Sequence, residues 1–332
     1  PTSRSGRRAQ EVTLARNLGL VAGVQVSERS LRVALADVSQ RIVADQRLPL
    51  PPAHRADSGL DRVAILVEEL AESVGAGLGE ILGVGVGVPA PVDSRTGIVS
   101  AHPILPGWGG VRVPEVLGRR LGLPVVVDNA TNLGALAESR FGVARDADSL
   151  VFVRVSHGVS MGLVIGGVVH RGRRGAAGEL GHVRDVEDGP ACRCGLTGCL
   201  EGSIGAAALA ARLAPTHGHL ALRDVVARAL AGDAACTRVV GEAGRRLGRA
   251  LASVCTVIDP DLLVLDGELV GAGEAFLGPL RRTLEADVLP TDPPGLRVEL
   301  AALGGDAPLR GALALALDAY EVGVTGPLSV LT

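Results

Sequence analysis

Three cysteines lie within eight residues of the sequence, in the stretch ACRCGLTGCLEG that covers residues 191–202. They are Cys192, Cys194 and Cys199, in a chain with only five cysteines. A structural zinc ion takes four nitrogen or sulfur ligands, and His182 is the nearest upstream histidine. Three clustered thiols cannot pair evenly as disulfides. The spacing therefore predicts a structural zinc ion held by these four side chains, with no open position for water; the alternative is a set of reduced structural cysteines.

Composition limits the class of protein. The chain has 332 residues, which is enough for two domains, and it is 47% hydrophobic and 21% charged, as globular proteins are. Aromatic residues make up only 2%, so few side chains are available to stack on nucleic-acid bases, and the net charge of −3 is not that of a DNA-binding surface. The chain shows neither a run of eighteen apolar residues nor a signal peptide, which predicts a cytoplasmic protein without a membrane partner.

Strands and helices alternate along the chain and would position these side chains. Residues 18–27, 31–38 and 41–50 read as three strands, and later segments alternate between helical and strand-like spacing of apolar residues. The segment LPVVVDN, residues 123–129, reads as a buried strand that runs directly into a helix. Two such series predict two α/β domains, and a cleft between domains is the usual place for a ligand.

Several motifs occur together and in a consistent order. GAAGELGHV is followed by CRCGLTGCLEG, and GVGVGVPAPVD, PGWGGV, LPVVVDN and GLVIGGVVHRG precede them. In these motifs the chain, over about residues 18–320, resembles the ROK family, which unites bacterial sugar kinases with sugar-responsive transcriptional repressors. The resemblance implies an α/β, two-domain, actin-like and ribonuclease-H-like fold with sugar in the interdomain cleft. The expected smaller domain covers residues 18–128 and 306–325, and the larger covers residues 129–305 with the zinc loop and the oligomerisation surface of a homodimer or homotetramer.

The resemblance also implies a sugar site. The zinc loop would hold His182 and so place Glu179 and Glu201 beside sugar hydroxyls, with Asn129 as a fourth contact. We call these four residues the candidate sugar site. Buried carboxylates without a partner are costly and a sugar would satisfy them, which favours binding. The alternative is that Glu179 and Glu201 only brace the zinc ligands.

Four features depart from the kinases of this family: the base, the hairpin turn, the first-strand turn and a late glycine pair. Those kinases carry an aspartate base where this chain has Ala130, and glycine-rich phosphate turns where it has residues 156–160. Gln25 replaces an aspartate at the first strand, Glu28 would repel phosphate in the following turn, and Asp266–Gly267 replaces a glycine pair. These departures predict a chain that is not an enzyme and needs no ATP. Because Ala130 also removes a contact to the hydroxyl that a kinase would phosphorylate, we expect a ligand without that group, such as a pentose, or weaker binding.

Two further segments have less certain roles. Trp108, the only tryptophan, would either line the cleft or plug the hinge. The run RGRRG, residues 171–175, offers charges for an anion but reads better as a solvated loop.

The basic leader SGRRAQ resembles the joint that connects the winged helix-turn-helix of family repressors to their sugar domain. Residues 1–17 are therefore expected to be a linker from a DNA-binding domain absent from this chain. The resulting hypothesis is the sugar-sensing domain of a repressor that contacts operator DNA through that other domain. The rival hypotheses are an ATP-dependent sugar kinase and a protein-binding regulator with a vestigial cleft.

Overall fold

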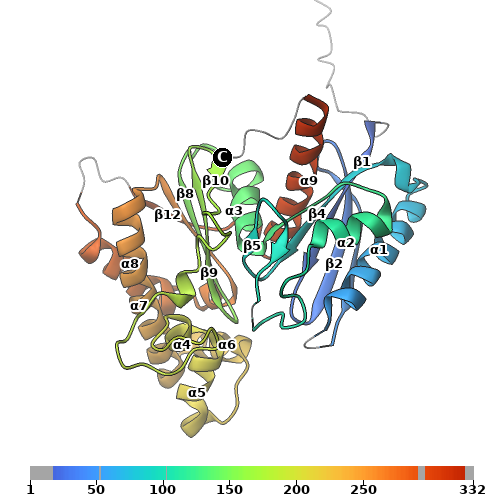
Figure 1. Cartoon of the computed structure of the whole chain (residues 1–332). Helices are drawn as coiled ribbons and strands as arrows, with labels where there is room; N and C mark the ends of the chain where they lie inside the picture. The colour runs from blue at the N-terminus through green and yellow to red at the C-terminus, as the bar shows by residue number, and fades with distance from the viewer. Residues whose placement is uncertain (1–17, 52–53, 102, 291–295, 326–332) are drawn as a thin grey trace, which may run out of the picture.

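The computed structural model describes residues 18–51, 54–101, 103–290 and 296–325, with side chains up to residue 320. The expected linker, residues 1–17, lies outside the described residues. Two five-stranded sheets dominate the structure, one built from each half of the chain (Figure 1).

The first sheet has the strand order β3-β2-β1-β4-β7. The first three strands form an antiparallel meander, and β4 and β7 then add in parallel to β1. The elements of this half are β1 (Leu20–Val26), β2 (Ser30–Asp37), β3 (Ile42–Pro49), α1 (Ala56–Ser73), η2 (Leu78–Glu80), β4 (Ile81–Val88), β5 (Val92–Asp93), β6 (Ile98–Val99), α2 (Val113–Leu121) and β7 (Val125–Asn129). Helices α1 and α2 pack on this sheet, and the three strands predicted at the start of the chain are confirmed.

The second sheet has the order β10-β9-β8-β11-β12. Its strands and surrounding elements are α3 (Ala130–Phe141), β8 (Leu150–Val155), β9 (Val159–Ile165), β10 (Val168–Val169), η3 (Leu180–His182), α4 (Glu201–Ile204), α5 (Ala206–His217), α6 (Leu222–Leu230), α7 (Ala234–Ile258), β11 (Leu262–Asp266), η4 (Glu268–Ala272), α8 (Glu274–Asp287) and β12 (Arg297–Leu300). Side chains alternate along β8, so that Val151 and Val153 join the core with α7 and α8, whereas Leu150 and Phe152 face α3.

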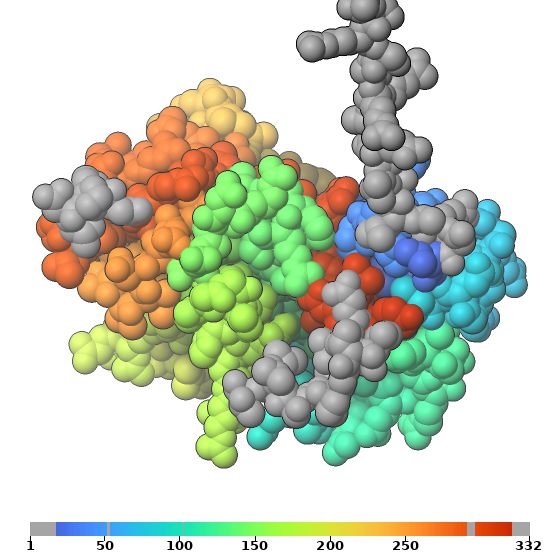
Figure 2. Space-filling model, turned by 90° about the horizontal axis from the view of Figure 1, so that it is seen from above, coloured from blue at the N-terminus to red at the C-terminus, as the bar shows by residue number. Residues whose placement is uncertain are grey.

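Helices α3 and α9 (Ala307–Thr325) lie between the two sheets. Seen from above, the red atoms of α9 separate the blue and cyan half from the green residues of α3 (Figure 2). Glycines allow this close packing. A side chain at Gly85 of β4 would collide with the carbonyl of Ala312, and one at Gly311 would collide with the carbonyl of Leu133. The chain crosses between the sheets twice. It passes from β7 through α3 to β8, and from β12 to α9.

The proposed boundaries at residues 128/129 and 305/306 fall at these two crossings, and the division at these residues stays a prediction. Among the residues that the structure describes, no helix is both long and apolar enough to cross a bilayer.

Candidate functional site

The four predicted metal ligands converge. The ligand atoms of His182, Cys192, Cys194 and Cys199 all lie within 4.8 Å of one another. Cys194 Sγ lies 3.7 Å from Cys199 Sγ, and Cys192 Sγ lies 3.7 Å from His182 Nδ1. Around a tetrahedral zinc ion with ordinary bond lengths, two sulfurs are about 3.8 Å apart and a sulfur and a nitrogen about 3.6 Å. The donor set and the spacing both fit such an ion.

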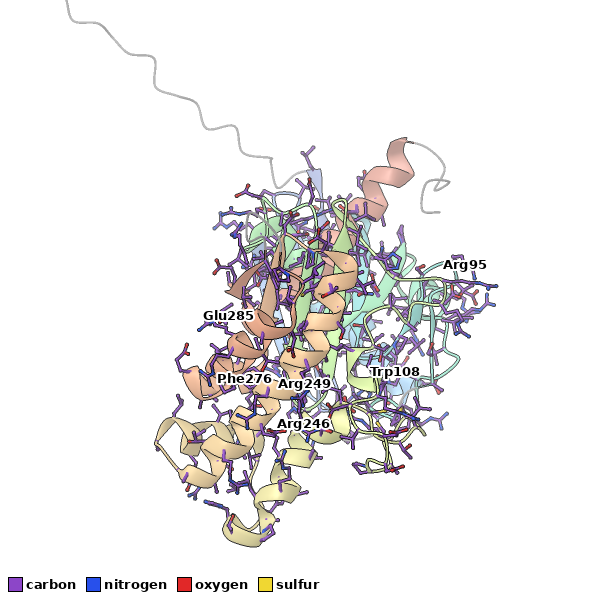
Figure 3. The ribbon with its side chains drawn as sticks, turned by 90° about the vertical axis from the view of Figure 1, so that its left-hand side faces the viewer. Arg95, Trp108, Arg246, Arg249, Phe276 and Glu285 are labelled. Atoms are coloured by element: carbon purple, nitrogen blue, oxygen red, sulfur yellow. The ribbon has the colours of Figure 1, made fainter. Side chains whose placement is uncertain are left out.

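The loop that carries the thiols, residues 183–200, is folded tightly on itself; we call it the cysteine loop. Gly195 and Gly198 have positive φ angles of 93° and 70°. A side chain at Gly198 would collide with the carbonyl of Val186, so this turn requires glycine. Arg246 on α7, labelled in Figure 3, donates to Asp185 at 2.6 Å and so attaches the loop to that helix.

The cysteine loop begins and ends at residues of the candidate sugar site. His182 ends η3, which directly follows Glu179, and the buried Cys199 precedes Glu201 at the start of α4. A metal ion bound to His182 and Cys199 would therefore fix the distance between the two glutamates.

Glu201 has partners within the protein. Its Oε2 accepts the backbone N–H of Val159 at 3.1 Å, and its Oε1 accepts Nε of Arg193 at 2.8 Å. Glu179 differs, because among the described residues its carboxylate accepts no hydrogen bond and meets His182 Nε2 only at 3.8 Å. Burial, and then repulsion by Glu201, raise the pKa of Glu179 to about 7. Glu201 is thus already braced, whereas Glu179 is left with unused acceptor capacity.

Asn129 reaches the same region from the other sheet. It is the N-cap of α3, and its Oδ1 accepts the N–H of Thr131 at 2.7 Å. The hydroxyl of Thr131 lies 2.7 Å from that of Ser160 on β9, next to Val159, which binds Glu201. Glu201 and the chain neighbours of the other three predicted residues therefore contact the first residues of β9. Whether the four residues bind a sugar stays a prediction.

The expectation of a solvated loop at residues 171–175 is wrong for its first residue. Nε of Arg171 donates to the buried carboxylate of Asp128 at 2.6 Å. Arg193 was not predicted as the partner of Glu201. The position of this arginine between two predicted metal ligands indicated that it could have a role, but the sequence did not indicate its partner.

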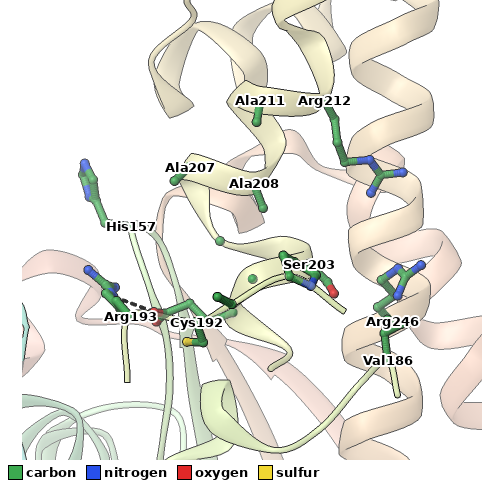
Figure 4. A pocket seen from close by; sticks show the side chains of 15 residues that line it. His157, Val186, Cys192, Arg193, Ser203, Ala207, Ala208, Ala211, Arg212 and Arg246 are labelled. Carbon is green, nitrogen blue, oxygen red and sulfur yellow. Dashed lines mark hydrogen bonds and ion pairs between the residues drawn. The ribbon is translucent and has the colours of Figure 1, made fainter. Parts of the chain in front are cut away.

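A cavity of about 660 Å³ lies beside Glu201 (Figure 4). Its wall is formed by the alanines of α5, and Arg193, Arg212 and Arg246 contribute its charged groups. Glu201 is the one member of the candidate sugar site that lines it. The cavity therefore adjoins the site behind Glu201 and does not contain the other three residues.

Trp108 does not lie open to a ligand. Its side chain is fully buried in the core of the first sheet, and its indole Nε1 donates to Nδ1 of His54 at 3.4 Å. Of the two roles expected for Trp108, the structure favours the structural plug.

Comparison with known proteins identifies the family of this chain. The sequence model of the ROK family matches residues 21–319, nearly the whole chain. The chain belongs to the ROK family. It is 30% identical to a glucokinase of Halalkalibacterium halodurans, with 87% of this chain and 92% of the glucokinase covered. It is 25% identical to the xylose repressor of Bacillus subtilis, with 96% of this chain and 82% of the repressor covered.

Among solved structures, a ROK family transcriptional regulator, a homologue of the E. coli MLC protein, superposes with a TM-score of 0.81 at 26% identity. The match covers 92% of this chain and 80% of the regulator. The two-domain, actin-like fold of ROK sugar kinases and regulators, expected from the motifs, is confirmed.

The prediction that this chain is not an enzyme is wrong. It rested on Ala130 and on altered turns, yet this ROK chain is at least as similar to a glucokinase as to a repressor. Phosphoryl transfer depends mainly on positioning and electrostatic stabilisation, so a missing base at one position does not establish that activity is lost. The expectation that no ATP is needed loses its basis with it.

Proposed function

We propose that this chain is the sugar-binding domain of a sugar-responsive transcriptional regulator, with a structural zinc ion in the cysteine loop. The observation that supports sugar binding best is the state of Glu179. Its carboxylate is largely buried, repelled by Glu201 and without a hydrogen bond among the described residues, and hydroxyl groups of a sugar would supply the missing donors. His182, held by the metal, and Asn129 complete the set of polar contacts.

The zinc ion would have a structural role in the cysteine loop. His182, Cys192, Cys194 and Cys199 would hold the ion, which would supply a rigid, closed tetrahedral node rather than a reactive water. These residues then keep η3 and the start of α4 together, so that Glu179 and Glu201 face the same ligand. Metal analysis of protein purified without chelators tests this part, and a stoichiometry near one zinc per chain is expected.

The proposed ligand is a pentose. Ala130 follows Asn129 as the first residue of α3 and offers no polar group to a further hydroxyl. A repressor among the relatives carries xylose in its name, which agrees with this choice. Calorimetric titration with matched pentoses and hexoses tests it, and a clear preference for a hexose would count against it.

Sugar binding would regulate the protein by shifting the equilibrium between its open-cleft and closed-cleft conformations. A sugar that binds the closed cleft better than the open one favours closure by its differential affinity. Operator DNA is the proposed macromolecular partner, the assembly is a homodimer or homotetramer, and the compartment is the cytoplasm.

A second candidate is an ATP-dependent sugar kinase, which the similarity to a glucokinase favours. Incubation with the bound sugar, magnesium and ATP distinguishes the two. Sugar-dependent ADP release would show phosphoryl transfer, and saturable sugar binding without ADP release would support the regulator.

A further inference from the structure

The carboxylate of Asp128 is the most heavily bonded group near the candidate sugar site. Its side chain is only 3% exposed. Oδ1 accepts the N–H of Asn129 at 2.7 Å and Nδ2 of Asn132 at 3.0 Å, and Oδ2 accepts Nε of Arg171 at 2.6 Å. Arg171 also donates through Nη1 to the carbonyl of Val169 at 3.2 Å. Both sides of the ion pair are therefore held in place.

This ion pair joins the two sheets. Asp128 lies one residue before the end of β7 in the first sheet, and Arg171 lies two residues after the end of β10 in the second sheet. Four residues after Arg171, Gly175 packs so closely on the carbonyl of Val92 in β5 that no side chain would fit there. The segment 170–178 thus leaves the second sheet and contacts the first half of the chain at two points, Asp128 of the first sheet and Val92 of the separate two-stranded sheet β5-β6.

The same segment then returns to the second sheet and ends next to Glu179 of the candidate sugar site. The carbonyl of Gly178 accepts the N–H of Met161 on β9, and Glu179 follows immediately. At the other end of the ion pair, Asp128 binds the backbone N–H of Asn129. The ion pair is therefore linked to two residues of the candidate sugar site. Asp128 binds the backbone of Asn129, and Arg171 belongs to the segment that leads to Glu179.

We infer that Arg171 is a positioning residue of the sugar site, and that its pair with Asp128 is an interdomain latch that sets Asn129 against Glu179. The inference rests on the proposed sugar binding for its functional consequence. Arg171 acts through Asp128 and needs no contact with the sugar. Because Asp128 is buried, removal of Arg171 leaves a carboxylate with only neutral donors, which favours rearrangement at the end of β7.

The test compares Arg171→Gln, Asp128→Asn and the double variant with a matched control, Arg140→Gln. Arg140 forms a two-pronged pair with Asp318, at 2.6 and 2.7 Å, that joins α3 to α9 and involves none of the site residues. Groups in one hydrogen-bonding network commonly couple strongly, so Arg171→Gln should weaken sugar affinity on the order of tenfold. The double variant should bind no more weakly than Asp128→Asn alone, and Arg140→Gln should stay within about twofold of the unmodified chain.

Amide hydrogen exchange without sugar gives an independent readout. The N–H groups of Gly175 and Ala177 bond to carbonyls within the segment, and that of Asn129 bonds to Asp128. Exchange at these amides should be faster in Arg171→Gln and unchanged in Arg140→Gln. If Arg171→Gln does not fold, Arg171→Lys keeps the charge without the guanidinium geometry and should show a smaller change in the same direction.

The outcomes separate the two claims. If the unmodified chain binds no sugar, the proposed function fails, and the exchange rates alone decide the latch. Unchanged exchange at these amides in Arg171→Gln would overturn the latch. Faster exchange with unchanged sugar affinity, or additive losses in the double variant, would overturn the positioning role of Arg171.

Discussion

Glu138 on α3 offers the sharpest test of how the two crossings between the sheets are held. Its side chain is fully buried. Oε1 accepts the N–H of Leu303, just before α9, at 2.8 Å, and Oε2 accepts the N–H of Val143, just after α3, at 3.1 Å. Among the described residues it forms no ion pair. One carboxylate therefore satisfies two backbone donors, one at each crossing.

The cost of its removal follows from these two bonds. A hydrogen bond to a charged group contributes about 1.5–3 kcal/mol, and a buried donor left unpaired costs about 1–3 kcal/mol. Glu138→Gln keeps one acceptor and turns an amide NH₂ toward the other donor, so we expect a loss of about 2 kcal/mol. Glu138→Ala leaves both donors unpaired, and because it also removes a desolvated charge we expect about 3–5 kcal/mol rather than the full sum.

Urea unfolding followed by circular dichroism measures these losses. The matched control is Glu115→Gln, because the Glu115 side chain is 57% exposed and, among the residues that the structure describes, it pairs only with Arg112 three residues away. An exposed pair of this kind contributes under about 1 kcal/mol, so the control should unfold near the midpoint of the unmodified chain. A Glu138→Ala midpoint equal to that of the control would refute the argument that this carboxylate joins the crossings.

Three other predictions concern the metal, the packing of α9 and one helix cap. Chelation should expose the two half-buried thiols, Cys192 and Cys194, to a thiol reagent at pH 8, while the buried cysteines stay unreactive until unfolding, because burial raises the pKa of Cys199 to about 12 and that of Cys255 to about 11; five reactive thiols in the folded, chelated protein would contradict this. Gly85→Ala should destabilise the protein by at least about 2 kcal/mol in thermal or urea unfolding, because α9 leaves no room for a methyl group, whereas Gly79→Ala, where space is open, should have little effect. The N–H of Cys236 lowers the pKa of Asp233 to about 2 from 3.8, so its stabilisation is present above pH 3.8 and is lost as the pH falls through 2; an NMR titration midpoint near 4 would contradict it.

Local chemistry was the part of this protein that the sequence predicted well. The cysteine loop needs only eighteen residues to bring His182 to its thiols, and glycine turns force that geometry. Asn129 at the end of a buried strand also predicted the start of a helix correctly. In each case the partners are close in the chain, so spacing and residue type carry the information.

Long-range partners were not predictable in this way. Arg171 and Asp128 are 43 residues apart, and Glu138 and Leu303 are 165 apart. Their contacts depend on how the two sheets pack against α3 and α9, which no local pattern specifies. The alanine at position 130 was likewise visible in the sequence, but activity depends on the whole site and could not be inferred from that position.

Calorimetric titration of the zinc-loaded chain with matched pentoses and hexoses, on the unmodified protein and on Glu179→Gln, tests the central claim most directly. We expect saturable binding of one sugar by the unmodified chain. Glu179→Gln, which keeps the shape of the side chain but loses the charged acceptor, should bind that sugar at least about tenfold more weakly. Absence of binding across the panel, or equal affinity in the two proteins, would contradict it.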